Sequence, residues 1–205
     1  MSDAGQRWDQ AYLAPGSAPW DIGRPQSAIV GLADAGEIRS PVLDSGCGTG
    51  EHALFLTERG YEVLGVDVAP TAIARARDKA QTRGLGGEFL IHDVLDLGAL
   101  GRRFATVIDS GVFHTFSDED RPRYVDSLAL VTTDGSALHL LCFSDQVPGE
   151  VGPRRVSQAE IREAFADGLE VERITGSQFD VARDFRLRPH AWLARIRKAQ
   201  PDPQR

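Results

Sequence analysis

The stretch Pro41-Val-Leu-Asp-Ser-Gly-Cys-Gly-Thr-Gly50 joins a short apolar run to a loop with three alternating glycines. Residues 51–59 then place apolar side chains at helical spacing, and Gly60 stands where a helix commonly ends on glycine. Glycine permits a sharp turn and a close approach of the backbone to a ligand, because it has no Cβ atom. The stretch therefore predicts a buried strand, a ligand-binding turn and a helix, in that order.

The same alternation of strand and helix continues along the chain. We expect strands at 41–44, 61–66, 88–91, 104–108 and 136–143, and helices at 51–59, 71–83, 121–131 and 157 to about 166. Capping-box patterns at 117–120 and 157–160 precede two of these helices. Strands at 168–174 and 191–197 have no helix between them, so they should pair antiparallel at one edge. This order predicts a doubly wound α/β fold, a seven-stranded and mostly parallel sheet with a C-terminal antiparallel hairpin; a loosely related α+β domain is the alternative.

The composition is that of a folded globular chain. Of the 205 residues, 41% are hydrophobic and 26% are charged, so we expect a single domain over 1–205 with a frayed tail at 200–205. The net charge of −7 disfavours binding to nucleic acid or to anionic membranes. No apolar run approaches the ~20 residues of a membrane span, and no signal-peptide pattern is present. These features predict a cytoplasmic protein.

Cysteines and histidines do not occur in metal-binding patterns. Cys47 and Cys142 cannot build a disulfide framework, and there is no CxxC pair. No histidine has a partner at zinc-ligand spacing, so we expect no metal. Cys47 lies near a helix start, which could lower its pKa, but we interpret it as a small residue that fits the glycine loop.

An acidic residue follows each of the first four predicted strands: Asp44, Asp67, Asp93 and Asp109. Ligands of open α/β sheets bind beyond the carboxyl ends of the strands, so this series predicts a binding site. For Asp44, turn chemistry at a strand end is an equal alternative. The third glycine comes one residue earlier than in a dinucleotide-binding fingerprint. An acid after the second strand suits the ribose of NAD or of an adenosyl ligand and does not choose between them.

The motif series Val42–Gly50, Gly65-Val-Asp67 and His92-Asp-Val94 resembles that of class I S-adenosylmethionine-dependent methyltransferases. The resemblance covers nearly the whole chain and implies S-adenosylmethionine as cofactor. By position, the loop of Gly46, Gly48 and Gly50 would border the methionine and ribose portions, and Asp67 would hold the ribose hydroxyls. Asp93 and Val94 would contact adenine, and Asp109 and Ser110 would line the methyl-transfer edge. Asp44 and Val68 complete the expected cofactor-binding set.

The N-terminal segment resembles one group within that family. Trp8-Asp-Gln-Ala-Tyr12 and Pro19-Trp-Asp-Ile-Gly-Arg-Pro-Gln26 are similar to the thiopurine S-methyltransferase-like group. That group includes thiol and halide methyltransferases and bacterial enzymes that methylate heterocyclic toxins such as hydroxyquinolones. The stretches 109–114 and 141–145, with Gly152-Pro153, look closest to the heterocyclic-toxin branch. The resemblance implies a helical cover at 1–36 over the cofactor.

Two tryptophans of that cover are candidate cofactor contacts. Trp20 would pack over the bound cofactor, and Trp8 would help to close the cover. An indole face attracts a cation such as a sulfonium by roughly 0.5–2 kcal/mol. The alternative for Trp20 is a hydrophobic plug between helix and sheet.

His114 and Asp109 are the candidate catalytic residues. His114 follows the fourth strand by a short loop, where an acceptor should sit, and histidine titrates near working pH. It would remove the proton of a hydroxyl acceptor. The alternative is a helix-entry residue that is hydrogen-bonded to the backbone. Phe113, Phe116 and Phe143, with the loop 144–155, would roof an apolar acceptor pocket. Phe179 and Phe185 fall in the 176–189 insertion, which we interpret as a surface loop.

These features predict an enzyme that moves a methyl group from S-adenosylmethionine to the hydroxyl or thiol of a small, heteroaromatic molecule such as a hydroxyquinolone. We expect a monomer or homodimer without a nucleic-acid or membrane partner. Thiol, halide and sugar-hydroxyl acceptors are the near alternatives. A nicotinamide-dependent oxidoreductase is weakened by the glycine spacing and by the lack of a Tyr-x-x-x-Lys pair. A non-catalytic cofactor-binding protein stays open, and methylation of nucleic acid or protein is disfavoured because no basic groove is visible.

Overall fold

Seven strands form one sheet in the order β3-β2-β1-β4-β5-β7-β6. In the computed structural model, which describes residues 3–13, 18–149, 152–182 and 189–198, the strands are β1 (Val42–Ser45), β2 (Val63–Asp67), β3 (Glu88–Ile91), β4 (Phe104–Ser110), β5 (Thr132–Phe143), β6 (Leu169–Gln178) and β7 (His190–Lys198). The first five pair in parallel, whereas β7 runs antiparallel to both β5 and β6. This is the predicted sheet, with the C-terminal hairpin at one edge.

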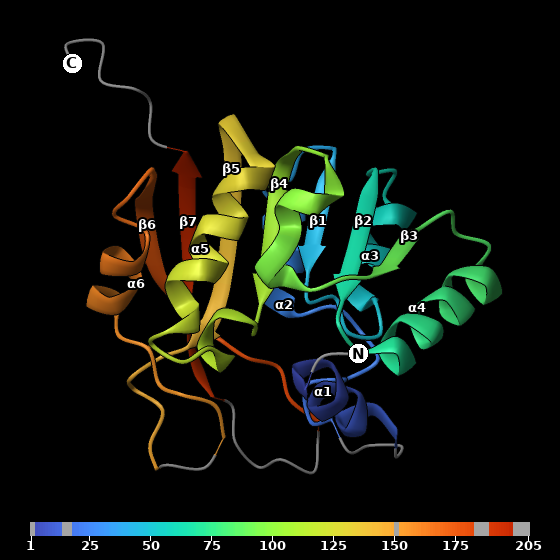
Figure 1. Ribbon diagram of the computed structural model, residues 1–205. Helices are drawn as coiled ribbons and strands as arrows, with labels where there is room; N and C mark the ends of the chain where they lie inside the picture. The colour runs from blue at the N-terminus through green and yellow to red at the C-terminus, as the bar shows by residue number, and fades with distance from the viewer. Residues whose placement is uncertain (1–2, 14–17, 150–151, 183–188, 199–205) are drawn as a thin grey trace.

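Helices cover both faces of the sheet (Figure 1). They are α1 (Asp3–Leu13), α2 (Ser27–Asp34), α3 (Glu51–Glu58), α4 (Pro70–Arg83), α5 (Asp120–Val131) and α6 (Gln158–Ala164), with 3-10 turns η1 (Val94–Leu100) and η2 (Phe113–Thr115). The capping box at the start of α6 forms in full, since the Ser157 side chain accepts from the Glu160 N–H and the Glu160 side chain accepts from the Ser157 N–H. No helix among these residues is long and apolar enough to cross a bilayer.

The core consists of one large cluster on each face of the sheet. One cluster joins inward side chains of β1, β2, β4 and β5 to η1, α5 and α6, with Tyr124 and Phe104 among its fully buried members. The other joins α2, α3 and α4 to the opposite face of the sheet. Alternate residues of a strand point to opposite faces, and Val42 and Leu43 accordingly belong to different clusters. The α2 helix thus packs into the core, whereas α1 lies elsewhere.

The carboxyl ends of the parallel strands meet at the lower edge of the sheet, where α1 lies in Figure 1. The segment that leaves β6 runs along this edge toward α1. Two chain regions far apart in sequence therefore border the same strand ends.

One predicted loop is shorter than expected. Pairing between β6 and β7 continues to Gln178 opposite His190, so residues 176–178 are strand. Phe179 is only 4% exposed, and the prediction that it belongs to a surface loop is wrong. The pairing continues because β7 begins at His190, so that residues 176–178 of β6 lie opposite residues 190–192 of β7. Phe185 lies outside the described residues.

Candidate active site

The glycine loop leaves β1 in a conformation that depends on glycine. Gly46, Gly48 and Gly50 have φ values of 71°, 53° and 84°. A Cβ atom at Gly46 would lie 2.2 Å from Val112 Cγ2, and one at Gly48 would lie 2.9 Å from the Tyr12 hydroxyl oxygen. The loop is therefore in close contact with the turn that follows β4 and with the N-terminal helix.

Asp67 connects the end of β2 to this loop. Its Oδ2 accepts a hydrogen bond from the Gly48 N–H at 2.9 Å, and its Oδ1 accepts one from the Ala69 N–H at 2.9 Å. Burial raises the pKa of this carboxyl, although both backbone donors favour the ionised form. Val68, the next residue, is half-buried. The carboxylate that is expected to hold ribose thus also holds the glycine loop in place.

Two buried oxygen atoms at neighbouring strand ends have no hydrogen-bond partner among the described residues. They are Asp44 Oδ2 on β1 and the hydroxyl of Ser110 on β4. The other oxygen of Asp44 lies 3.8 Å from His52 Nδ1. Because Ser45 and Asp109 are register partners, these two oxygens belong to the same edge of the sheet. Buried acceptors without partners are costly unless a ligand supplies donors, and a ligand that carries an ammonium group fits this site.

Asp109 lies beneath the loop that follows β4. Its Oδ1 accepts from the Val112 N–H at 2.8 Å, and its Oδ2 accepts from the Phe113 N–H at 3.0 Å and from the Tyr124 hydroxyl at 2.9 Å. The side chain is fully buried, and burial raises its pKa to about 7. Tyr124 is also within 3.0 Å of the Ser45 hydroxyl. This carboxylate holds the backbone of the turn and the Tyr124 hydroxyl, and its catalytic role stays a prediction.

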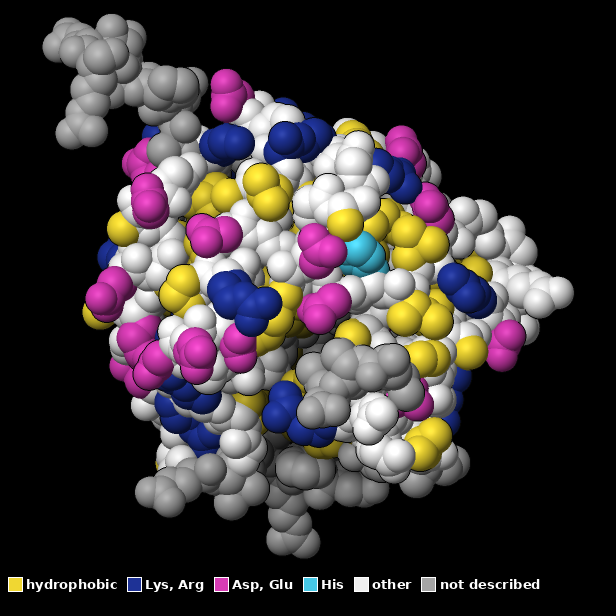
Figure 2. Space-filling view, in the orientation of Figure 1, with side chains coloured by type: hydrophobic (Ala, Val, Ile, Leu, Met, Phe, Trp, Pro, Cys, Tyr) yellow, Lys and Arg dark blue, Asp and Glu magenta, His cyan; other side chains and the backbone are white. Residues whose placement is uncertain are grey.

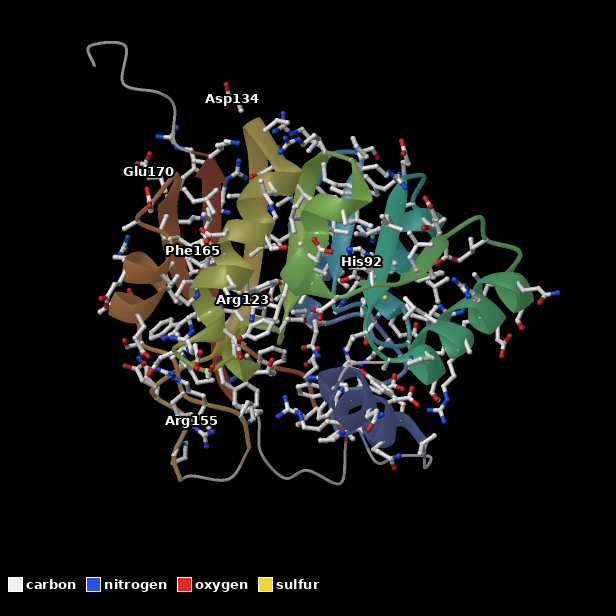
Figure 3. The ribbon with its side chains drawn as sticks, viewed as in Figure 1. His92, Arg123, Asp134, Arg155, Phe165 and Glu170 are labelled. Carbon is white, nitrogen blue, oxygen red and sulfur yellow. The ribbon has the colours of Figure 1, made fainter. Side chains whose placement is uncertain are left out.

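The loop that leaves β3 carries the predicted adenine contacts. Asp93 is half-buried, and its Oδ1 accepts from the Leu95 N–H at 3.0 Å, which caps η1. Val94 is 9% exposed. His92, labelled in Figure 3, places its Nε2 within 2.8 Å of the Asp96 carbonyl. The loop conformation is thus fixed by its own polar residues.

The N-terminal cover reaches the glycine loop through aromatic side chains. Trp20 Nε1 donates to the Tyr12 hydroxyl at 3.0 Å, and the Trp8 and Trp20 rings meet edge to face with centroids 5.9 Å apart. Thr49 of the loop donates to Asp21 Oδ1 at 2.7 Å. Trp20 is 42% exposed, so it is not the buried plug of the alternative interpretation. Tyr12 and Asp21, which sequence reasoning missed as site residues, are the side chains through which the cover contacts the loop.

A second set of contacts ties the cover to the segment after β6. Asp180 Oδ2 accepts from Arg24 Nη1 at 2.9 Å and from the Ser27 N–H and hydroxyl at 2.9 and 2.7 Å. Gln26 exchanges two hydrogen bonds with the backbone of Asp180. The Ala182 N–H donates to the Pro19 carbonyl at 3.0 Å. We call these contacts the Asp180 latch.

His114 begins an aromatic cluster with Phe143 and Phe179. The ring centroids of His114 lie 5.1 Å from Phe143 and 5.7 Å from Phe179, and those two phenylalanines are 5.1 Å apart. The Phe143 N–H donates to His114 Nδ1 at 2.9 Å. Burial and the charges of Arg155 and Arg121 lower the pKa of His114 to about 3. The backbone-bonded alternative for His114 is therefore the one found.

The other predicted pocket phenylalanines face the core. Phe113 is fully buried and stacks on Phe165, with centroids 5.5 Å apart, because η2 turns its side chain under α5 and α6. Its prediction as a pocket residue is wrong. Phe116 packs on Tyr124 at 4.8 Å and is half-buried, so its pocket role stays a prediction.

Two arginines border the aromatic cluster. Arg155, labelled at the lower edge in Figure 3, donates to backbone carbonyls of its own loop and lies 5.9 Å from the Phe143 ring centroid. Arg121 is 6% exposed and lies 4.7 Å from the Phe113 ring centroid. Its Nε and Nη2 are buried without a hydrogen-bond partner within the described ranges. Figure 2 shows a recess on this face between α1 and the side that carries α5 and α6. Neither arginine has a sequence signal that could have placed it here.

Groups of three side chains suited to a metal ion do not occur in the part of the chain that the structure describes. Cys47 is buried, and burial raises its pKa well above the usual thiol range. Burial therefore favours the neutral thiol over the thiolate.

Comparisons with known proteins agree with this geometry. A methyltransferase-domain family model matches residues 42–135. A 2-heptyl-1-hydroxyquinolin-4(1H)-one methyltransferase from Mycobacteroides abscessus is 38% identical over 85% of this chain and 78% of its own length. A solved structure described as "Conversion of a Disulfide Bond into a Thioacetal Group during Echinomycin Biosynthesis" is 38% identical, with a TM-score of 0.85 over 98% of this chain and 95% of that one. A magnesium protoporphyrin IX methyltransferase from Synechocystis with bound S-adenosylmethionine has a TM-score of 0.70 at 22% identity, over 97% of this chain and 99% of that one.

A doubly wound sheet with this strand order and a glycine loop at its carboxyl edge defines a methyltransferase of the Rossmann-like class. The chain belongs to the class I S-adenosylmethionine-dependent methyltransferases. It is an enzyme, and S-adenosylmethionine is its cofactor. The glycine loop and the unpartnered oxygens of Asp44 and Ser110 fit that cofactor.

Proposed function

We propose that this enzyme methylates the ring hydroxyl of a small heteroaromatic acceptor of the hydroxyquinolone kind. The observation that carries the proposal is the aromatic cluster of His114, Phe143 and Phe179 at the cofactor edge of the sheet. His114 follows β4, Phe143 ends β5, and Phe179 follows β6. Flat apolar side chains suit a planar heteroaromatic ring. The relative that is 38% identical is named for such an acceptor.

The residues that would hold the cofactor divide by its parts. Asp67 would hold the ribose hydroxyls, and Asp93 with Val94 would border adenine. The partnerless oxygens of Asp44 and Ser110 would receive the ammonium group of the methionine portion. Trp20, with Trp8 and Tyr12 beside it, would cover the sulfonium.

When bound, S-adenosylmethionine supplies a methyl group on a cationic sulfur, and its leaving group is a neutral thioether. The departing side therefore needs no acid. The chain's own task is to hold the acceptor atom at ~3–3.5 Å from the methyl carbon and to keep water out. The Asp180 latch supports this task because it joins the cover to the segment that carries Phe179.

Acceptor binding tests the proposal directly. Protein loaded with S-adenosylhomocysteine is titrated calorimetrically with 2-heptyl-1-hydroxyquinolin-4(1H)-one, with a small aliphatic thiol and with a simple sugar. We expect micromolar binding of the quinolone and at least tenfold weaker binding of the other two. Phe179→Ala should weaken quinolone binding, whereas Phe55→Ala, a half-buried phenylalanine of α3 outside the cluster, should not. Equal binding of all three acceptors would contradict the proposal.

A thiol acceptor is the second candidate. The solved structure at 38% identity is described by sulfur chemistry, and a probable thiol methyltransferase from Arabidopsis thaliana is 26% identical over 85% of this chain and 78% of its own length. Preferred binding of the thiol in the titration above would favour this candidate.

A further inference from the structure

The proton on His114 is assigned by its backbone partner. The Phe143 N–H donates to Nδ1, so Nδ1 carries the lone pair and the neutral ring has its proton on Nε2. Burial and two arginines lower the pKa of the ring to about 3, so it is neutral at physiological pH. One nitrogen is already bonded and the other already protonated. His114 therefore cannot act as the general base that the sequence predicts.

The free Nε2–H lies beside the turn after β4. A Cβ atom built on Gly111 would lie 3.6 Å from Nε2 and 3.5 Å from Phe179 Cζ, so the glycine leaves space beside the donor. Nε2 makes no hydrogen bond with the described residues. Ser110, whose hydroxyl also has no partner there, immediately precedes this glycine. A polar donor and a gap next to it point to a ligand atom that accepts.

The charges around this donor favour an anion. Arg155 faces the ring from the loop after β5, and Arg121 faces it from α5 with two buried nitrogens that have no hydrogen-bond partner in the described chain. Asp109, on β4, is turned away toward backbone donors and Tyr124. Asp180, after β6, is bound in the latch, and the His190 ring of β7 lies against Ser144. Glu160 of α6 offsets part of the Arg121 charge, because its Oε1 lies 3.6 Å from Arg121 Nη1. The charges that act on the His114 ring itself are those of the two arginines, and they favour an anion beside it.

We propose that His114 is an acceptor-binding residue, and that its Nε2–H donates to the ionised oxygen or sulfur of an acceptor that the enzyme takes up already deprotonated. The inference rests on the proposed function, because it concerns the same acceptor site. The acceptor loses its proton to water before it binds. A lone pair of its oxygen or sulfur then forms the new bond to the methyl carbon as the bond from that carbon to the sulfonium breaks, and the electron pair stays on the sulfur. No proton moves in this step.

The pH profile separates this inference from base catalysis. kcat/KM is measured between pH 5 and 9 for a series of hydroxyquinolones and thiols that differ in pKa. We expect the acidic inflection to move with the pKa of each acceptor. Asp109, with a pKa of about 7, would contribute an inflection that stays in place for every acceptor. If the pH profile of kcat/KM shows only an inflection at the same pH for every acceptor, whatever the pKa of that acceptor, the inference is overturned.

Two substitutions at His114 separate binding from simple packing. In His114→Asn the amide oxygen can replace Nδ1 as acceptor for the Phe143 N–H, but nothing replaces Nε2. In His114→Gln the longer amide can return a donor to the place of Nε2. For the ionised acceptor and S-adenosylhomocysteine-loaded protein, we expect affinity to fall by about 10- to 100-fold in Asn, as for a hydrogen bond to a charged group, with partial recovery in Gln. The methylated product, which has no charge, should lose less affinity than the ionised acceptor in His114→Asn, because it loses only the contact with the imidazole ring. Unchanged affinity in His114→Asn would overturn the inference.

The tautomer is measurable without any ligand. Nitrogen-15 NMR of the imidazole should show His114 neutral, with the proton on Nε2, from pH 5 to 9. A proton on Nδ1, or a titration near pH 6.5, would overturn the inference. If no hydroxyquinolone or thiol is bound or methylated, the proposed function fails by itself, and the NMR result stays interpretable. If they are methylated with a fixed pH inflection, the inference alone fails.

Discussion

At the scale of single residues, the site depends on which polar atoms are already engaged. Asp67 and Asp109 both accept hydrogen bonds from backbone N–H groups, whereas Asp44 and Ser110 each have a buried oxygen without a partner in the described chain. The presence or absence of a hydrogen-bond partner therefore distinguishes the carboxylates that stabilise the site from the oxygens that are free to bind a ligand. The hydrogen bond from the Phe143 N–H to His114 Nδ1 is likewise the basis for our proposal that His114 donates to the acceptor through Nε2.

Asp67→Ala should lower the affinity for S-adenosylhomocysteine by about 30- to 100-fold, or ~2–3 kcal/mol, because the ligand loses its ribose acceptor and the loop loses its anchor. Calorimetric titration measures this change. Asp34→Ala, which removes an exposed carboxylate paired with Arg59, serves as the control and should leave affinity unchanged. Equal affinity in wild type and Asp67→Ala would remove Asp67 from the cofactor site.

Trp20→Ala should weaken S-adenosylmethionine about 2- to 30-fold more than S-adenosylhomocysteine, because the indole face attracts the sulfonium and the product lacks that charge. The ratio of the two dissociation constants gives the result. Leu13→Ala, an exposed apolar residue of the same cover, should change neither. An identical loss of both ligands would make Trp20 a packing residue.

At the scale of elements, the turn after β4 is stabilised by hydrogen bonds to Asp109, which in turn accepts one from Tyr124 of α5. Asp109 and Tyr124 secure the backbone of residues 112–113, and that turn positions both Gly46 and His114. The α5 helix thereby supports the turn through Tyr124.

Asp109→Asn should reduce the free energy of unfolding by about 1–3 kcal/mol, because an amide NH2 would face N–H donors that need an acceptor. Urea denaturation gives the value. Asp126→Asn, on the exposed side of α5, should change stability by less than about 0.5 kcal/mol. A neutral Asp109→Asn would show that the turn does not depend on this carboxylate.

Asp180→Ala should release the cover from the segment after β6. We expect faster amide exchange in residues 19–27 and 178–182, with little change in Tm, because the lost contacts are partly exposed. Hydrogen exchange with mass-spectrometric detection measures the change. Unaltered exchange in both segments would mean that the latch does not hold the cover.

Strand order and the glycine loop follow from local pattern, since apolar runs, glycines and strand-end acids are read directly from neighbouring residues. The predicted strand 88–91 agrees with β3 at both ends. The errors arise from contacts between residues that are distant in sequence. The partner of His114 is Phe143, 29 residues later, and Phe113 is directed into the core by Phe165. No local spacing encodes either contact, nor the approach of Arg121 and Phe179 to the same cluster.

At the scale of the whole molecule, buried titratable groups couple stability to pH in opposite directions. His114 and His139 have pKa values lowered to about 3 and about 4, so as pH falls below 6.5 the unfolded chain takes up protons first and stability is lost. The pKa of Asp109 is raised to about 7, so its contribution declines as pH rises from about 4 to 7.

On lowering the pH from 6 to 4.5, wild type should lose about 2 kcal/mol more stability than His114→Asn, which removes one of the two buried imidazoles. Urea denaturation at both pH values gives the difference. Parallel losses in the two proteins would show that His114 is protonated in the folded state over this range.

The sheet and the glycine loop are those of an S-adenosylmethionine-dependent methyltransferase, and we propose that the aromatic cluster is its acceptor site for a planar ring. The measurement that tests this most directly is the initial rate of methyl transfer to 2-heptyl-1-hydroxyquinolin-4(1H)-one at saturating S-adenosylmethionine, with the product identified by mass spectrometry. We predict one O-methylated product and one equivalent of S-adenosylhomocysteine per turnover. Binding of S-adenosylhomocysteine without any methylation of the quinolone would contradict the assignment of the acceptor.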